Sequence, residues 1–179
     1  MGMVSPPLRH VFDQFLTPDT RVLIPGAGRA YEAIYLHRAG HPNVWVCDWA
    51  DEAFAHLRRQ VPDFPVDRLL VTDFFELTGT WDLVVEQTFL SALLPAQRPA
   101  YVRQVHRLLS DNGHLTGVLF NAPFPHDGPP FGATPEEYAE LFEPAFHLEQ
   151  WHTATDSIAP RRGRELFVRL RKKTPTNFI

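Results

Sequence analysis

Two glycines separated by a single residue follow the first apolar run of the chain, residues 21–24. The fragment Pro25-Gly26-Ala27-Gly28 therefore stands between a predicted strand and a predicted helix. Glycine allows a sharp turn and lets a ligand approach the backbone without a Cβ in the way. The N-terminus of a helix adds free N–H donors and a partial positive charge. The fragment predicts a small-ligand site, although tight turns also use glycine for purely structural reasons.

An acidic residue ends the next predicted strand, residues 43–47. Asp48 lies 22 positions after Gly26, where a carboxylate can accept hydrogen bonds from both hydroxyls of a ribose. Both NAD and S-adenosylmethionine carry that ribose. A dinucleotide site normally has a third glycine at the position of Tyr31, because the helix must crowd the pyrophosphate. S-adenosylmethionine has no pyrophosphate, so the pattern favours this cofactor, with Tyr31 among its predicted neighbours.

Polar and aromatic residues follow the next two predicted strands. Asp73 can accept a hydrogen bond from an adenine amino group, and Phe74 and Phe75 can lie beside the base. Glu86-Gln87 ends the fourth strand, where an open α/β sheet binds its ligands, next to the expected sulfonium and methyl acceptor. Each residue also has a plainer interpretation: a helix cap for the aspartate, core packing for the phenylalanines, a solvated loop position for the glutamate.

Methyl transfer from S-adenosylmethionine is an in-line displacement in which the sulfonium loses its positive charge. Catalysis then depends largely on positioning the reactants and excluding water. An aromatic face can make a cation–π contact with the sulfonium. Phe89 or the predicted cofactor neighbour Trp49 could provide it, although either residue could equally belong to the core or to the wall of the site. We assign no catalytic base, because a soft sulfur nucleophile needs only to be ionised. His126 is the one histidine that we expect to be accessible.

A loop rich in proline and glycine covers residues 123–130. Prolines stiffen such a loop, and its phenylalanines supply apolar surface of the kind that lines small-molecule pockets. We therefore predict that Phe124, Pro129 and Phe131 bind the methyl acceptor from above, together with Phe89.

Alternating strands and helices must position these residues. Strands are predicted at 21–24, 43–47, 69–71, 83–85 and 114–120, with helices between them. This alternation is typical of βαβ units and a mainly parallel sheet. The segments 146–151 and 165–170 read as two late strands that form an antiparallel hairpin at the edge of the sheet.

Composition places these elements in one globular domain, residues 1–179. The net charge of −4 gives no reason to expect nucleic acid as a partner, and no apolar run reaches the roughly 20 residues of a membrane span. We find neither a signal-peptide pattern nor Cys/His spacing for a metal. The single Cys47, which cannot form an internal disulfide, favours a cytoplasmic location. The oligomeric state is left open.

Taken in order, these motifs resemble the thiopurine methyltransferase family and its thiol- and halide-methylating relatives. The resemblance runs from Arg21 to Leu148 through the fragments Val22-Leu23-Ile24-Pro25-Gly26-Ala27-Gly28-Arg29-Ala30-Tyr31-Glu32, Ala39-Gly40-His41, Asp48, Asp73-Phe74-Phe75, Trp81-Asp82-Leu83-Val84, Thr88-Phe89, Arg98-Pro99-Ala100-Tyr101, Gly128-Pro129-Pro130-Phe131 and Glu143-Pro144-Ala145-Phe146. It implies a seven-stranded, Rossmann-like class I methyltransferase fold and methyl transfer from S-adenosylmethionine, often to sulfur. Family members usually carry Asp-Arg where this chain has Glu86-Gln87, which argues against thiopurine itself as the acceptor.

We therefore predict an S-adenosylmethionine-dependent methyltransferase that acts on a small molecule, through sulfur or another soft nucleophile. Two alternatives remain open at this point. One is a protein that binds the cofactor but has weakened catalysis, consistent with Gln87. The other is a nicotinamide-dependent oxidoreductase, which Tyr31 and the missing Tyr-x-x-x-Lys pair disfavour.

Overall fold

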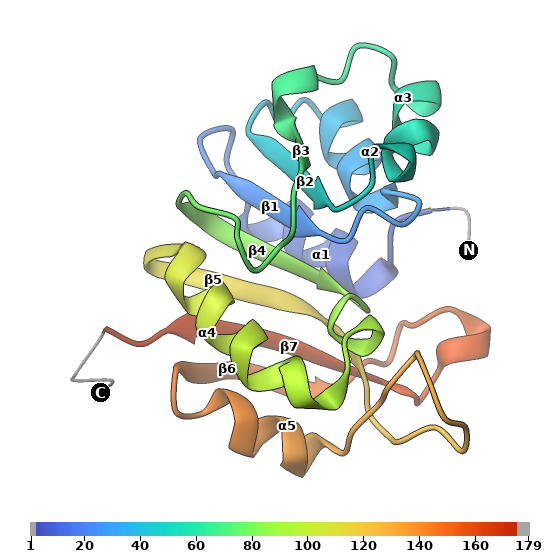
Figure 1. Ribbon diagram of the computed structural model, residues 1–179, viewed down its shortest axis with the longest axis vertical. Coiled ribbons are helices and arrows are strands. Elements are labelled where there is room, and N and C mark those ends of the chain that lie inside the picture. Colours follow the sequence, from blue (N-terminus) through green and yellow to red (C-terminus); the bar gives the residue numbers. More distant parts are fainter. Residues whose placement is uncertain (1–2, 175–179) are drawn as a thin grey trace.

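A seven-stranded, mainly parallel sheet forms the centre of the molecule in a computed structural model that describes residues 3–174 (Figure 1). The strand order is β3-β2-β1-β4-β5-β7-β6. The strands are β1 (Val22–Pro25), β2 (Val44–Asp48), β3 (Leu69–Val71), β4 (Trp81–Gln87), β5 (Leu109–Phe120), β6 (Phe146–Thr153) and β7 (Glu165–Lys172). The first five strands are parallel, and β7 runs antiparallel to both β5 and β6. The predicted fold class is confirmed.

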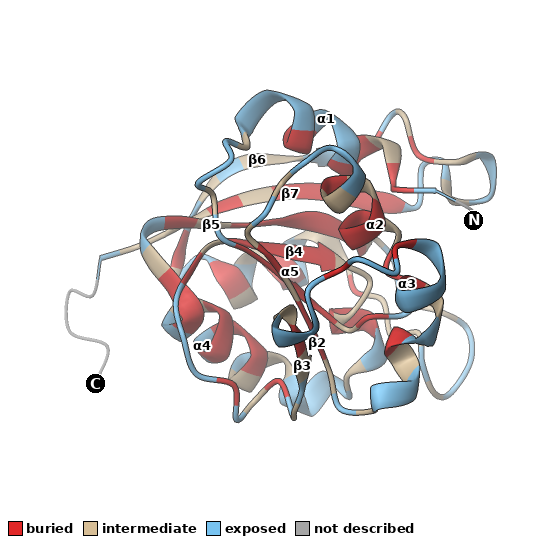
Figure 2. Ribbon diagram, turned by 90° about the horizontal axis from the view of Figure 1, so that it is seen from above, coloured by how far each residue is buried: buried red, intermediate tan, exposed pale blue. Residues whose placement is uncertain are grey.

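Five α-helices cover the two faces of this sheet (Figure 2). They are α1 (Pro6–Phe15), α2 (Tyr31–Arg38), α3 (Ala55–Gln60), α4 (Arg98–Leu108) and α5 (Pro135–Phe142). Helices α1, α2 and α3 pack on one face and α4 and α5 on the other, so each face has its own hydrophobic core. The parallel strands are sandwiched between these layers, as expected for strands joined by helical crossovers.

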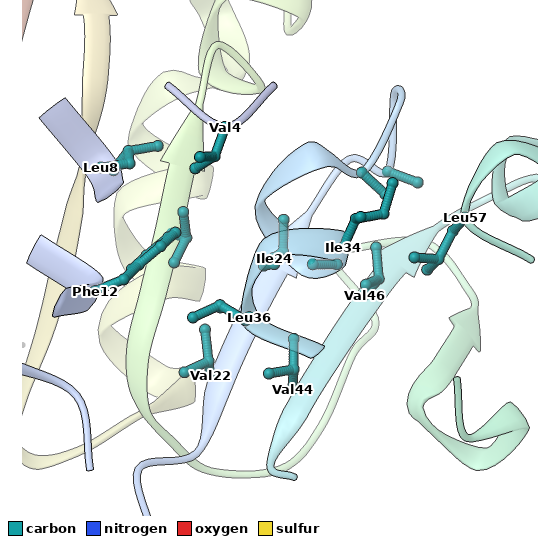
Figure 3. Packing of buried hydrophobic residues seen from close by; sticks show 14 of the residues in the cluster. Val4, Leu8, Phe12, Val22, Ile24, Ile34, Leu36, Val44, Val46 and Leu57 are labelled. Atoms are coloured by element: carbon teal, nitrogen blue, oxygen red, sulfur yellow. The ribbon is translucent and has the colours of Figure 1, made fainter. Parts of the chain in front are cut away.

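The alternation of side chains along the central strands divides them between these two cores. Val22 and Ile24 of β1 point to the core beneath α1, α2 and α3, where Leu36 packs against them (Figure 3). Leu23, between them, belongs to the core of α4 and α5. A fully buried parallel strand is apolar on both faces for this reason. The short run before the glycine turn therefore anchors that turn rigidly to the middle of the sheet.

Three elements differ from the prediction. Helix α1 was not predicted, although Leu8 and Phe12 are buried on one side of it. Strand β5 begins at Leu109, so residues 111–113 lie within a strand that shifts its register against β4 rather than in a separate turn. The late hairpin forms as predicted, but β7 inserts between β5 and β6, so only β6 lies at the edge.

Within residues 3–174, none of the helices is both long and apolar enough to span a membrane.

Candidate cofactor cavity

A cavity of about 550 Å³ opens where the first four strands end. Its size is within the range of roughly 300–1,000 Å³ for small-molecule pockets, and the carboxyl ends of parallel strands are the usual ligand site of such sheets. The described residues that line it are Gly26, Gly28, Cys47, Asp48, Trp49, Thr72, Asp73, Phe74, Phe75, Gln87, Thr88, Phe89, Ala92, Leu93 and Gln97. Most of the predicted cofactor residues thus come together, along with Phe89.

The glycine turn has a packing requirement as well as a conformational one. Gly26 and Gly28 have φ of +73° and +50°, where side chains are rarely tolerated. A Cβ on Gly26 would lie 2.5 Å from Cδ2 of Phe89, whereas a Cβ on Gly28 would meet nothing within 4 Å. The N–H of Gly26 donates to the Cys47 carbonyl of β2 at 2.8 Å. Gly26 therefore lets the Phe89 ring pack against the turn, and Gly28 keeps the turn open to the cavity.

The carboxylate of Asp48 connects the glycine turn to the end of β2. Its Oδ2 accepts the N–H of Ala27 at 2.9 Å, and its Oδ1 accepts the N–H of Ala50 at 3.2 Å. Each carboxylate oxygen has two lone pairs, so the group can still accept hydrogen bonds from a ligand in the cavity. Trp49, next in the chain, is 84% exposed at the same cavity.

Asp73 and its two aromatic neighbours follow β3 and line another part of the cavity. The Oδ1 of Asp73 accepts the N–H of Phe75 at 2.8 Å, so this carboxylate caps a local turn and not a helix. Phe74 is buried and packs edge-on against Phe89, with ring centroids 5.3 Å apart, and also contacts Tyr101. The core-packing interpretation therefore holds for Phe74, which presents the rest of its surface to the cavity.

Glu86 differs most from its prediction. Its side chain is fully buried and does not line the cavity, so it is neither a solvated loop residue nor in position to touch a ligand there. Strand alternation explains this, because consecutive residues of β4 point to opposite faces. Gln87 consequently lines the cavity, where its Oε1 is buried and finds no hydrogen-bond partner within residues 3–174.

Other predicted residues lie outside the cavity lining. Tyr31 points to a second cavity between α1, α2 and α3, where its ring meets His56 edge-on at 5.7 Å, because it begins α2 on the far side of the turn. Pro25 and Ala27 are buried within the turn itself. The predicted acceptor-binding residues Phe124, Pro129 and Phe131 also lie beyond the lining.

The loop that carries these last residues is tied down at one end. The Phe131 N–H donates to the Ser91 carbonyl at 2.6 Å, and Nη2 of Arg98 donates to the carbonyls of Phe131 and Gly132 at 3.2 and 3.1 Å. At the other end of the loop, Phe124 stacks on His126. The loop is therefore anchored beside the cavity wall rather than over it.

The chemistry of the lining suits a positively charged, adenosine-containing ligand. The charged side chains among the described lining residues are Asp48 and Asp73, both acidic, and three phenylalanines supply aromatic surface. Burial, together with the nearby carboxylates of Asp48 and Asp73, raises the pKa of the Cys47 thiol to about 12, so this cysteine is a thiol rather than a nucleophilic thiolate. Thr72, Thr88, Ala92, Leu93 and Gln97 were not predicted to line the cavity, although all follow strands β3 and β4.

The fold and the position of the cavity define a class of proteins. The solved structure of 1,6-didemethyltoxoflavin-N1-methyltransferase from Burkholderia thailandensis, which holds S-adenosylhomocysteine, matches with a TM-score of 0.75 at 23% identity over 94% of this chain and 77% of that one. At that identity the likeness shows the fold, which is the Rossmann-like fold of class I methyltransferases.

The family follows from the sequence comparison. The model of the thiopurine S-methyltransferase family matches residues 1–176, so the chain belongs to this family and is an S-adenosylmethionine-dependent methyltransferase. Among named relatives, probable thiol methyltransferase 2 of Arabidopsis thaliana is 25% identical over 97% of this chain and 79% of its own. Thiocyanate methyltransferase 1 of Brassica oleracea is 25% identical over 96% and 78%. The predicted family, cofactor and enzyme class are confirmed.

Proposed function

We propose that this enzyme methylates the sulfur of a small molecule, with S-adenosylmethionine seated in the cavity at the ends of β1–β4. One observation carries the proposal: a single cavity joins the glycine turn and two carboxylates to an apolar wall of Phe89, Ala92 and Leu93. The polar part suits adenosine and the methionine moiety, whereas the apolar part suits the body of an acceptor. The relatives named for thiol and thiocyanate methylation support sulfur as the methylated atom.

Within the cavity, we assign the ribose hydroxyls to Asp48 and the adenine amino group to Asp73. Phe74 and Phe75 would flank the base. The Gly26–Gly28 turn would admit the methionine moiety close to the N-terminus of α2, which favours its carboxylate. The bound cofactor supplies an electrophilic methyl group and a neutral leaving thioether. The apolar wall would hold the acceptor in line with that methyl group and exclude water, which is the main requirement of such a displacement.

No side chain on this wall is positioned as a general base. Phe89, Ala92 and Leu93 carry no titratable group, and the Cys47 thiol next to the site has a raised pKa. An acceptor that ionises in water near neutral pH meets this condition without help, and a thiol ionises far more readily than a phenol does. The lack of a base on this wall thus favours sulfur over oxygen acceptors.

A binding measurement followed by a matched acceptor panel tests the proposal. Calorimetry should show binding of S-adenosylmethionine and S-adenosylhomocysteine, and no binding of NAD. Thiophenol, phenol and aniline share one ring and differ only at the nucleophilic atom, so mass spectrometry of their products isolates the acceptor preference. We expect methylation of thiophenol well above the reaction without protein. Faster methylation of phenol or aniline would contradict sulfur as the acceptor atom.

A further inference from the structure

The carboxylate of Glu86 is buried behind the cavity wall and accepts a hydrogen bond from the backbone of the segment that carries Phe89. Its Oε1 and Oε2 accept the N–H of Leu90 at 3.1 and 3.3 Å. Leu90 directly follows Phe89, whose ring packs against the glycine turn and against Phe74. The carboxylate therefore fixes the backbone of the segment that carries the aromatic wall.

The same carboxylate is itself held firmly in place. The Tyr101 hydroxyl of α4 donates to its Oε2 at 2.5 Å, and both side chains are fully buried. On the neighbouring strand, a Cβ at Gly117 would overlap the backbone and Cβ of Glu86, so only glycine fits opposite it. Tyr101 also contacts the rings of Phe74 and Phe89. One buried hydrogen-bonded pair thus supports the aromatic residues of the cavity.

We propose that Glu86 is a positioning residue of the cofactor site: its carboxylate, held by Tyr101, anchors the Phe89–Leu90 backbone and keeps the aromatic wall in its binding position. The inference rests on the proposed location of the cofactor in this cavity. Glu86 does not touch the ligand in this account. Glu86 acts by fixing the aromatic wall, so cofactor affinity depends on this residue although its side chain does not contact the cofactor.

The ionisation of Glu86 provides a signature that simple packing would not. Burial raises its pKa to about 7, against the opposing effects of the Tyr101 hydroxyl and the N–H groups of Leu90 and Phe89. Among the described residues, Tyr138 of α5 also interacts electrostatically with Glu86, and Arg98 lies over the Tyr138 ring. Only the ionised carboxylate offers both oxygens as acceptors. Cofactor affinity should therefore rise as the pH increases through about 7.

Two buried tyrosines provide a matched pair of variants. Tyr101 and Tyr138 are both fully buried, but only the Tyr101 hydroxyl makes a hydrogen bond to Glu86 among the described residues. Tyr101→Phe and Tyr138→Phe therefore remove the same atom, and only the first removes a hydrogen bond to Glu86. Glu86→Gln removes the charge while keeping the size of the side chain.

The measurement is the dissociation constant of S-adenosylhomocysteine from pH 6 to 8, with each variant first shown to be folded by circular dichroism. Because hydrogen bonds to charged groups contribute about 1.5–3 kcal/mol, we expect Glu86→Gln to weaken binding at pH 8 by about 10-fold or more and to abolish the pH dependence. Tyr101→Phe should weaken binding at pH 8 by roughly 5-fold and move the transition to higher pH, since it removes a group that lowers the Glu86 pKa. Tyr138→Phe should change binding by less than about 2-fold.

Several outcomes would overturn the inference. Equal effects of the two tyrosine variants would mean that packing alone matters. A pH transition seen with S-adenosylmethionine but not with S-adenosylhomocysteine, which lacks the sulfonium charge, would mean that Glu86 acts by attracting the sulfonium and not by holding the wall. If Asp48→Asn leaves affinity unchanged, the cofactor location is wrong. If Asp48→Asn weakens binding and the Glu86 and Tyr101 variants do not, only the positioning role fails.

Discussion

At the scale of single residues, Asp48 combines a structural contact in the glycine turn with the cofactor-binding role that we propose for it. The sequence predicts a ribose acceptor at this position. The structure adds that the same carboxylate receives the N–H groups of Ala27 and Ala50 and so stabilises the glycine turn. Replacement by alanine would disturb both functions together. A test of Asp48 must therefore separate ligand binding from the shape of the turn.

Asp48→Asn combined with a ribose analogue makes that separation. The amide keeps the size of the carboxylate but loses acceptor capacity, so S-adenosylhomocysteine should bind about 10- to 100-fold more weakly, from about 1.5–3 kcal/mol for hydrogen bonds to a charged group. The wild-type enzyme should prefer this ligand over its 2′,3′-dideoxy analogue, and the variant should lose most of that preference. Asp51→Asn, which affects an exposed ion pair with Arg58, is the control. An undiminished preference in Asp48→Asn would remove this residue from the ribose site.

At the scale of elements, the loop between β5 and α5 depends on Arg98 of α4. The guanidinium donates to the Phe131 and Gly132 carbonyls and lies 5.5 Å from the centroid of the Tyr138 ring. Gly132 lets the two ends of the loop approach each other, because a Cβ there would overlap the Ala122 carbonyl. The loop that we predicted to bind the acceptor is thus held at its base by a helix that begins beside the cavity, directly after Gln97 of its lining.

Arg98→Met should release this anchor while preserving most of the side chain's length. Loss of hydrogen bonds from a charged group to two carbonyls should lower the free energy of unfolding by about 1.5–3 kcal/mol. Chymotrypsin cleavage after Phe131 should become faster. Arg58→Met breaks an exposed ion pair instead and should cost less than about 1 kcal/mol. Similar losses in the two variants, measured by urea unfolding, would show that Arg98 does not anchor the loop.

At the scale of the whole molecule, each face of the sheet buries a glutamate. Glu32 of α2 accepts the N–H of Ser5 beneath one face, and Glu86 lies beneath the other. Burial raises the pKa of both carboxyls. A raised folded-state pKa means that the folded protein holds the proton more tightly than the unfolded chain does. These groups therefore stabilise the fold at acidic pH, and that stability is lost as the pH rises through their folded pKa values.

The Glu86 contribution can be measured by difference. The free energy of unfolding of the wild type should fall relative to that of Glu86→Gln between pH 4.5 and pH 7. The total fall in this relative free energy is about 3 kcal/mol, because the pKa rises from 4.5 to about 7 on folding and each pKa unit corresponds to about 1.4 kcal/mol. Urea unfolding at pH 5, 6, 7 and 8 provides the comparison, and other groups cancel between the two proteins. Parallel curves over this range would show that Glu86 does not titrate as described.

Much of the architecture could be predicted because its signals are local. The strands before Gly26, Asp48 and Asp73 are short apolar runs that end in turn residues, and their order predicts a parallel sheet. Helix α1 was missed because its apolar face follows a proline-rich start and precedes no motif. The start of β5 was missed because residues 111–113 resemble a turn, with Asn112 at φ +63°, and yet lie within the strand.

The sequence by itself determined the family, the cofactor and the clustering of Gly26, Asp48 and Asp73 at one end of the sheet, since residues that end parallel strands must share an edge. Only the tertiary structure decided that Glu86 is buried while Gln87 faces the cavity, that Tyr31 points to another cavity, and that Arg98 anchors the loop. The physical reason is that a side chain's direction depends on strand alternation and on packing partners distant in the chain. The glycine turn lines the cavity in which we propose that the cofactor binds, and the buried Glu86–Tyr101 pair is the support that we propose for the aromatic wall of that cavity.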